Sequence, residues 1–230
     1  ANQRLVAVVD PLGNKSARGY DARGRLLSQT DASGNTTQYQ FEKERLIGVE
    51  YPTYQERYQY DNLEQIKSET REYLENGTAR SQSDQYRYLA GGLLEQHLDA
   101  ANNPTGNGYD ALGRLISSTD AEGGVTQFAY DQRNNLIRVT DPVDRVTEFR
   151  YNARDAVIAE IKPGDASTPR TERRYAYDAV GNLKQTITPD GRVSQYQYDA
   201  ANRLIQTRHF TNAAQAASAS AERTISSTYS

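Results

Sequence analysis

The chain has 230 residues and a formal net charge of -3, with 27 basic residues scattered among 30 acidic ones, so it carries no basic patch for nucleic acid. Only 36% of its residues are apolar and its mean hydropathy is -0.86, whereas a globular domain usually has about 45–50% apolar residues, which excludes a thick two-layer core. The absence of Cys excludes disulfides and thiolate metal sites, and no segment approaches the roughly 20 apolar residues that cross a bilayer.

Aromatic residues recur along the chain at a steady spacing. The 17 Tyr and 4 Phe are too many for a disordered chain. Five of the eight intervals between successive members of one series are 21 residues, and the other three are 19, 28 and 26. We call the members of this series the anchor residues: Tyr20, Phe41, Tyr60, Tyr88, Tyr109, Tyr130, Tyr151, Tyr177 and Tyr198.

In chain order, each anchor is followed by the same signals. An Asp directly after the anchor and a residue that tolerates positive φ four positions after it indicate a tight first turn, with Gly24, Gly113, Asn134, Asp155, Gly181 and Asn202 at the fourth position. An aliphatic residue two positions later opens a second strand. A second turn precedes the next anchor by seven residues, at Gly13, Gly34, Gly123, Asp144 and Gly191. Each unit therefore predicts two strands and two turns, about 17 strands in all.

The units anchored at Phe41, Tyr60 and Tyr88 depart from this pattern. They have lost the turn Asp, the turn Gly or both, and Arg45 and Glu64 stand where a residue of positive φ is expected. We therefore expect irregular strand pairing in this part of the chain.

The later units predict strands of alternating character. Residues 125–130, 146–151 and 193–198 each present Thr or Ser and two aromatic residues on one face and mostly polar residues on the other, and 115–119 forms a second-strand segment. This alternation is typical of an antiparallel sheet with a wet side. Inserted residues are expected around 162–170, and the Ala/Ser-rich stretch 213–221 predicts a loop or short helix between strands.

The string YDALGRLISSTDAEGGVTQFAYD, from Tyr109 to Asp131, resembles a YD repeat of the Rhs type, and the segments that begin at Tyr20 and Tyr177 repeat it. The resemblance covers residues 1–230 as about nine repeats. It implies an all-β fold in which tandem hairpins form a long, curved antiparallel sheet within a hollow shell, as in bacterial Rhs polymorphic toxins, Tc toxin C subunits and teneurins. The family's C-terminal self-cleavage motif has no match in this sequence.

The resemblance also implies a function. The segment is expected to be part of an encapsulation shell that encloses a C-terminal toxin domain until delivery, in a secreted or exported protein of the type VI secretion effector class without a visible signal peptide here. Expected partners are the remaining shell repeats, the toxin domain and secretion-apparatus spike proteins, with no nucleic acid and no membrane span. The alternative is a carbohydrate-binding or adhesive surface module, since aromatic rows can stack on sugar rings.

Catalytic, metal and cofactor sites are not predicted, so we expect the segment not to be an enzyme. The repeated Asp residues occupy positions where a hairpin turn needs a side-chain acceptor. His97 and His209 lie in different repeat contexts, and neither has Ser, Cys or a second His at a recognisable catalytic spacing. No glycine motif of a phosphate cradle or a nucleophile elbow occurs. Of the 21 aromatic residues, 16 fit the repeat register, which favours packing within the sheet over sugar binding.

Overall fold

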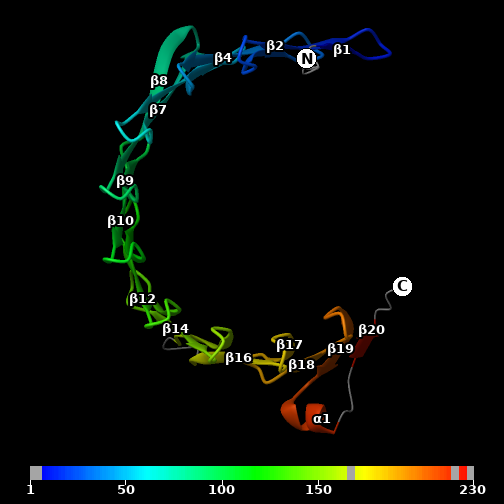
Figure 1. The fold of residues 1–230 in the computed structure, drawn as a ribbon. Helices are drawn as coiled ribbons and strands as arrows, with labels where there is room; N and C mark the ends of the chain where they lie inside the picture. Colours follow the sequence, from blue (N-terminus) through cyan, green and yellow to red (C-terminus); the bar gives the residue numbers. More distant parts are fainter. Residues whose placement is uncertain (1–6, 165–168, 219–222, 227–230) are drawn as a thin grey trace. The chain divides into compact units, whose positions relative to one another are not determined.

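The structure, a computed structural model, describes residues 7–164, 169–218 and 223–226. Within these ranges the chain forms 20 β-strands and one short α-helix, α1 (Ala213–Ala217). The all-β fold is therefore confirmed. The chain divides into two units, Ala1–Gly108 with Thr119–Gly123, and Tyr109–Ser118 with Gly124–Ser230. Figure 1 shows that consecutive strands follow one another in chain order within each unit.

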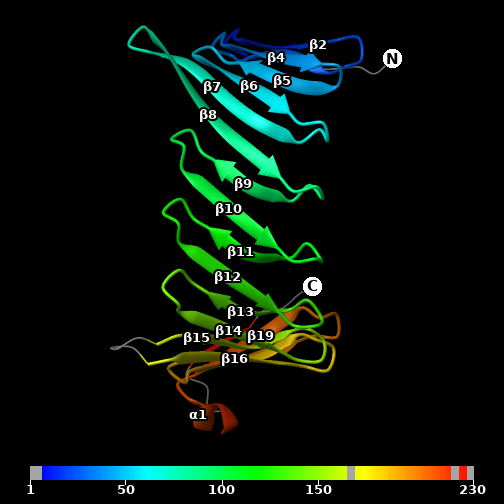
Figure 2. The same ribbon diagram turned by 90° about the vertical axis from the view of Figure 1, so that its left-hand side faces the viewer.

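The first unit holds ten strands, and each pairs antiparallel with the next one along the chain. The longest pair is β7 and β8, which lie side by side in Figure 2. The strands are β1 (Ala7–Val9), β2 (Lys15–Tyr20), β3 (Leu26–Thr30), β4 (Thr36–Glu42), β5 (Arg45–Glu50), β6 (Tyr54–Tyr60), β7 (Ile66–Glu75), β8 (Thr78–Tyr88), β9 (Leu94–Leu98) and β10 (Pro104–Tyr109).

The second unit repeats this arrangement, with antiparallel pairing between consecutive strands from β12 to β20. The sequence analysis places strands at 115–119, 125–130, 146–151 and 193–198, and all four are confirmed. The strands are β11 (Leu115–Thr119), β12 (Val125–Tyr130), β13 (Leu136–Thr140), β14 (Val146–Tyr151), β15 (Val157–Lys162), β16 (Thr171–Tyr177), β17 (Leu183–Ile187), β18 (Val193–Tyr198), β19 (Leu204–Phe210) and β20 (Arg223–Ser226).

The strand count differs from the predicted 17. Nine anchors delimit the 18 strands from β2 to β19, and the described residues add β1 before the first anchor and β20 after the last. In the two predicted insertions, residues 165–168 and 219–221 lie outside the described residues. Between β19 and β20, α1 begins after Asn212, whose side chain accepts a hydrogen bond from the Gln215 backbone N–H.

Few side chains are fully buried, as the low apolar content predicts. The buried hydrophobic residues among those described are Val49, Ala159, Ile161, Val193 and Phe210. Most strand residues are half-buried, and exposed and less exposed positions alternate, for example along β12. Hydrophobic burial stabilises a protein in proportion to the apolar area removed from water. Because little apolar area is buried here, more of the stability depends on hydrogen bonds and side-chain contacts between neighbouring strands.

The irregular repeats keep their hairpins. Glu64 adopts a positive φ of 66°, and its turn makes the same hydrogen bonds as the regular ones, from Asp61 N to Gln65 O and from Glu64 N to Asp61 O. Its positive φ is uncommon for a residue of this type. Glu64 departs from the residue types of the pattern, but the irregularity expected here does not extend to its turn.

The repeat that begins at Phe41 is shorter because each of its two turns has lost one residue. Phe41 pairs with Leu46 and Glu50 with Gln55, whereas Tyr20 pairs with Leu26 six positions away. Arg45 is consequently a strand residue, and Lys43 supplies the positive φ, at 53°.

The 28-residue interval has another cause. Strands β7 and β8 are longer than their neighbours and are joined by a two-residue Asn76–Gly77 turn with φ values of 52° and 77°. Asn-Gly is the preferred sequence for this turn because both central residues need positive φ, so this signal was available in the sequence.

Candidate functional site

The first and second turns of the repeat share one carboxylate geometry. In the turn after Tyr109, Asp110 Oδ1 accepts from the backbone N–H groups of Leu112 and Arg114 at 2.9 and 3.0 Å, and Oδ2 accepts from Arg114 Nε at 2.7 Å. The residue directly after the position of positive φ, which we call the left-handed position, is Arg or Asn. Its side chain donates a hydrogen bond to the second carboxylate oxygen. Among the described residues this arrangement recurs at Asp10, Asp21, Asp31, Asp99, Asp131, Asp141, Asp178 and Asp199.

The hydrogen bonds shift the acidity of these aspartates. Donors that bind the charged form favour it, so the Arg25 side chain lowers the pKa of Asp21 to about 2. The Asn14 and Asn35 side chains lower the pKa values of Asp10 and Asp31 in the same way. The carboxylates therefore stay ionised at neutral pH as structural acceptors.

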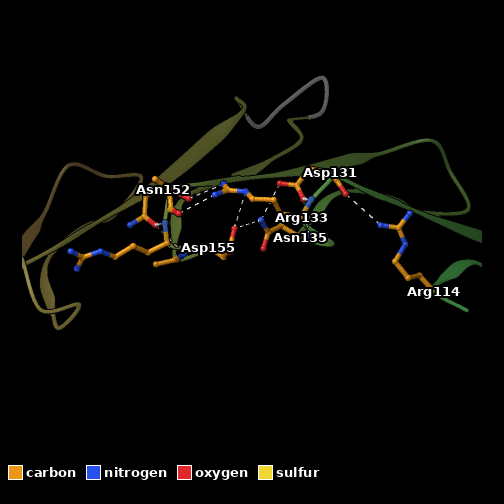
Figure 3. A network of polar contacts seen from close by, with 9 residues as sticks. Arg114, Asp131, Arg133, Asn135, Asn152 and Asp155 are labelled. Atoms are coloured by element: carbon orange, nitrogen blue, oxygen red, sulfur yellow. Dashed lines mark hydrogen bonds and ion pairs between the residues drawn. The ribbon is translucent and has the colours of Figure 1, made fainter. Parts of the chain in front are cut away.

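Neighbouring first turns in the second unit are joined by side chains, as Figure 3 shows. Arg114 reaches the next turn, where its Nη1 donates to Asp131 O at 3.4 Å. Arg133 donates to Asn152 O at 3.0 Å and pairs with Asp155 at 3.1 Å. We call this row of linked first turns the turn ladder.

Asn135 adds a third link to the turn ladder. Its amide donates both to Asp131 Oδ2 at 3.0 Å, within its own turn, and to Asp155 Oδ1 at 2.7 Å, in the next one. Asn182 makes the equivalent bond to Asn202 Oδ1 at 3.0 Å. The turns that begin at Asp131 and Asn152 are thus each held by their own Asp or Asn side chain and by the preceding turn.

The first unit has its own links between turns, with different residues. Arg25 donates to Lys43 O, Arg45 pairs with Glu64 at 3.3 Å, and Gln65 donates to Gly92 O at 3.0 Å. Most of these side chains are half-exposed, and an exposed ion pair stabilises a protein by less than about 1 kcal/mol. Each link therefore adds little to the stability of the sheet, and the links between turns stabilise it through their number.

Five anchor tyrosines connect their repeat to the preceding one through the phenol hydroxyl. The Tyr151 hydroxyl donates to Leu136 O at 2.8 Å. Leu136 begins β13, whose pairing with β14 starts only at Arg138, so the phenol binds a carbonyl near the strand end. The same bond is made by Tyr60, Tyr88, Tyr130 and Tyr177 to Leu46, Ile66, Leu115 and Val157 at 2.7–3.0 Å.

Arginines after the first turns also lie over the next anchor ring. The guanidinium of Arg25 is 4.7 Å from the centroid of Phe41, and that of Arg114 is 4.8 Å from Tyr130. Cation–π contacts of this kind contribute about 0.5–1 kcal/mol at exposed sites. The ring, its hydroxyl and the turn therefore act together at the repeat junction.

A buried carboxylate distinguishes the irregular repeats. Glu56, only 7% exposed, stands four residues before Tyr60, where regular repeats have Thr or Ser. It accepts from the Tyr58 hydroxyl at 2.8 Å and pairs with Arg71 at 3.0 Å. Burial is the main reason that the pKa of Tyr58 is raised, and its hydrogen bond to Glu56 adds to the effect.

The two histidines lie in strands, His97 in β9 and His209 in β19. His97 stacks on Tyr86, with ring centroids 4.8 Å apart, and its Nε2 lies 2.9 Å from Asp84 Oδ1. These three residues lie on β8 and β9, and His97 is half-buried.

The structure brings a serine to His209, which the sequence analysis did not anticipate. Ser194 Oγ lies 2.9 Å from His209 Nδ1, across the pairing of β18 with β19. Among the described residues His209 forms no ion pair with a carboxylate, which a serine–histidine nucleophile uses for orientation. The sequence separation of 15 residues gives no signal, because only the strand register places the two residues opposite each other.

Across the ranges that the structure covers, no group of three or more His, Asp or Glu side chains is arranged to hold a metal ion. No helix there is long and apolar enough to cross a membrane. The turn ladder could have been found in the sequence, since Arg or Asn follows the left-handed residue of most Asp turns.

Comparison with solved structures shows the same fold in larger proteins. Crystal structures of TcdB2-TccC3-TEV, of TcdB2-TccC3 without its hypervariable C-terminal region, and of TcdB2-TccC3-Cdc42 match with TM-scores of 0.57, 0.56 and 0.55. Each is 17% identical over 88% of this chain, which shows the fold alone. The chain spans only 13% of the length of those proteins.

The sequence itself matches one family model. That model, the RHS Repeat, matches residues 1–36, 20–79, 109–142, 130–167 and 177–213, which together exceed half of the chain. No curated protein matches the sequence. The matched ranges contain every anchor residue except Tyr88, and this chain belongs to the RHS repeat family.

Proposed function

We propose that this chain is a wall segment of an Rhs-type toxin shell, which encloses a C-terminal toxin domain of the same parent chain until delivery. The observation that carries the proposal is that successive repeats are linked through the hydroxyls of five anchor tyrosines and through the turn ladder. These links tie strands together without a thick core. A wall that separates a lumen from solvent needs this property, whereas a binding module does not.

The solved structures also support the proposal. The fold is that of a segment of the TcdB2-TccC3 complexes, and one of these structures lacks a hypervariable C-terminal region of its own protein. A hypervariable C-terminal region in that protein fits the C-terminal toxin domain that we propose for the parent chain.

We propose a structural rather than a catalytic role for these residues. The Asp carboxylates are occupied by turn N–H groups and by Arg or Asn side chains, so they are not free for acid–base chemistry.

The proposal also includes export of the parent chain as a type VI secretion effector, with spike proteins of the secretion apparatus as partners. The resemblance of the repeats to those of bacterial Rhs toxins supports an extracellular destination.

Limited proteolysis of the protein from the complete open reading frame tests the proposal. We expect the C-terminal domain to resist cleavage in the native protein and to be cleaved rapidly when expressed alone. Replacing Arg133 and Asp155 by Ala should leave the strands in place but loosen the wall, which would increase cleavage of the cargo. Equal cleavage rates for the enclosed and the isolated domain would refute enclosure.

A further inference from the structure

Strand pairing gathers four arginines on one face of the second unit. Residues that pair across an antiparallel sheet point to the same face, and residues along one strand alternate between the two faces. One row of paired residues across β13, β14, β15 and β16 consists of Arg138, Glu148, Ile161 and Glu172. The adjacent row on the same face consists of Arg150, Ala159 and Arg174. Arg170 also reaches this face, because its Nη2 donates to Glu148 Oε2 at 2.7 Å. We call these six charged residues the arginine patch.

The arginine patch has more positive than negative groups. Glu148 pairs with Arg170 at 2.7 Å and with Arg138 at 3.9 Å. Glu172 pairs with Arg174 at 3.0 Å. These three arginine side chains are 56–63% exposed, so their guanidinium groups remain open to a partner. The patch as a whole has four guanidinium groups and two carboxylates, an excess of two positive charges in a chain whose formal net charge is -3.

Arg150 is the unpaired member of the arginine patch. It is exposed and forms no ion pair with the described residues. Ala159 alone stands between Arg150 and Arg174 in their row, so the Cα atoms of the two arginines lie about 10 Å apart at a strand spacing of about 4.8 Å. The hydrogen bond from Arg174 lowers the pKa of Glu172, and the positive charge of Arg150 adds to the effect. Both guanidinium groups therefore lie near one carboxylate, and Arg150 keeps its hydrogen-bond donors for another.

We propose that the arginine patch binds an acidic segment of a partner polypeptide. A guanidinium group can hold a carboxylate through two parallel hydrogen bonds. The patch extends over four strands, about 14 Å, and an extended segment covers this distance with about five residues at about 3.3 Å each. Two or more carboxylates in such a segment can therefore meet guanidinium groups on different strands. This surface goes beyond the shell role and does not depend on it.

The extent and the charge of the arginine patch favour this partner over other anions. A single phosphate ion is too small to contact arginines at both ends of a patch that crosses four strands. Nucleic acid binding depends on the neutralisation of many phosphates, whereas the patch has an excess of only two positive charges. A short run of Asp or Glu residues matches both the extent of the patch and its small excess of charge.

The fluorescence anisotropy of a dye-labelled hexaglutamate peptide, titrated with the full chain at about 0.01 M salt, tests the proposal. We expect saturable binding that weakens as the salt rises to about 0.15 M, because the Debye length falls from about 30 Å to about 8 Å. Arg150→Gln should weaken binding about two- to fivefold, as the loss of one exposed ion pair predicts, and it breaks no ion pair within the protein. Glu148→Gln should tighten binding by a similar factor, a result that partial unfolding would not produce.

Arg173→Gln is the matched control. Arg173 is next to Arg174 on β16 but pairs with Glu160 on the opposite face of the sheet. This variant changes the net charge as Arg150→Gln does, and it should leave peptide binding nearly unaltered. Equal weakening by the two variants would overturn the proposal, because binding would then follow the net charge and not the patch. So would the absence of saturable hexaglutamate binding at low salt, or binding of tripolyphosphate in its place.

Discussion

The repeats between Tyr109 and Tyr151 in the second unit and those between Phe41 and Tyr88 in the first are built on the same anchor but stabilised differently. The former have 21-residue spacing, small hydroxyl residues four before the anchor, and turns closed by Asp with Arg or Asn. The latter have shortened turns, a long hairpin and a buried carboxylate, Glu56. The anchor hydroxyl bond is therefore kept when the loop length changes. The side chains on the sheet faces around it differ between the two regions.

Substitution at the position four residues before the anchor should give the largest difference in stability loss between the two regions. Glu56→Ala leaves Arg71 and the Tyr58 hydroxyl without their partner, and we expect a loss of roughly 2–3 kcal/mol, reduced from the fully buried case because Arg71 is half-exposed. Thr147→Ala at the matching position should cost less than about 1 kcal/mol. Hydrogen exchange of the β6 and β14 amides at increasing urea concentration measures the loss of stability in each variant. Equal losses would show that the two regions are not stabilised differently.

The anchor hydroxyl should contribute alike in both regions. Tyr60→Phe and Tyr151→Phe each remove one hydrogen bond to a backbone carbonyl, and each should lower the free energy of unfolding by about 1 kcal/mol. The ring and its packing are kept in both variants. A loss confined to one of the two would show that the junction is not the common element.

Replacing the residue at the left-handed turn position by Gly should change the stability differently in the two regions. Glu64→Gly removes an unfavourable positive φ and only an exposed ion pair with Arg45, so we expect a gain of about 0.5–1 kcal/mol. Asn134→Gly should be neutral or slightly destabilising, because Asn tolerates this φ and its Oδ1 accepts from Arg114 at 2.8 Å. Thermal unfolding of the two variants measures the contrast, which a loss for Glu64→Gly would contradict.

The smallest effect concerns acid. Asp21 has a pKa lowered from 3.8 to about 2, so the unfolded chain takes up a proton first as the pH falls. The stability that this group contributes is complete above about pH 4 and is lost as the pH falls towards 2. Asp21→Asn should flatten this part of the curve of melting temperature against pH, and an unchanged slope would show that Asp21 is not linked to folding.

Much of the fold could be predicted from period and turn chemistry. The strands at 125–130, 146–151 and 193–198 follow from alternation, and the positive φ at Gly24 or Asn134 follows from residue type. The Glu64 turn could not be predicted, because local hydrogen bonds to Asp61 override the preference of glutamate. The Ser194–His209 contact and the arginine patch depend on strand register, which composition does not reveal.

The strand register across the repeats is the central claim, and disulfide trapping tests it most directly because the chain contains no Cys. The pairs Val139 with Thr147 and Thr70 with Ser83 are register partners in the regular and irregular regions. We predict that replacing both members of either pair by Cys gives a disulfide on mild oxidation, since paired residues have suitable Cα separations. Cross-linking of the shifted pair Val139 with Glu148, whose side chains point to opposite faces, in preference to the first pair would contradict the account.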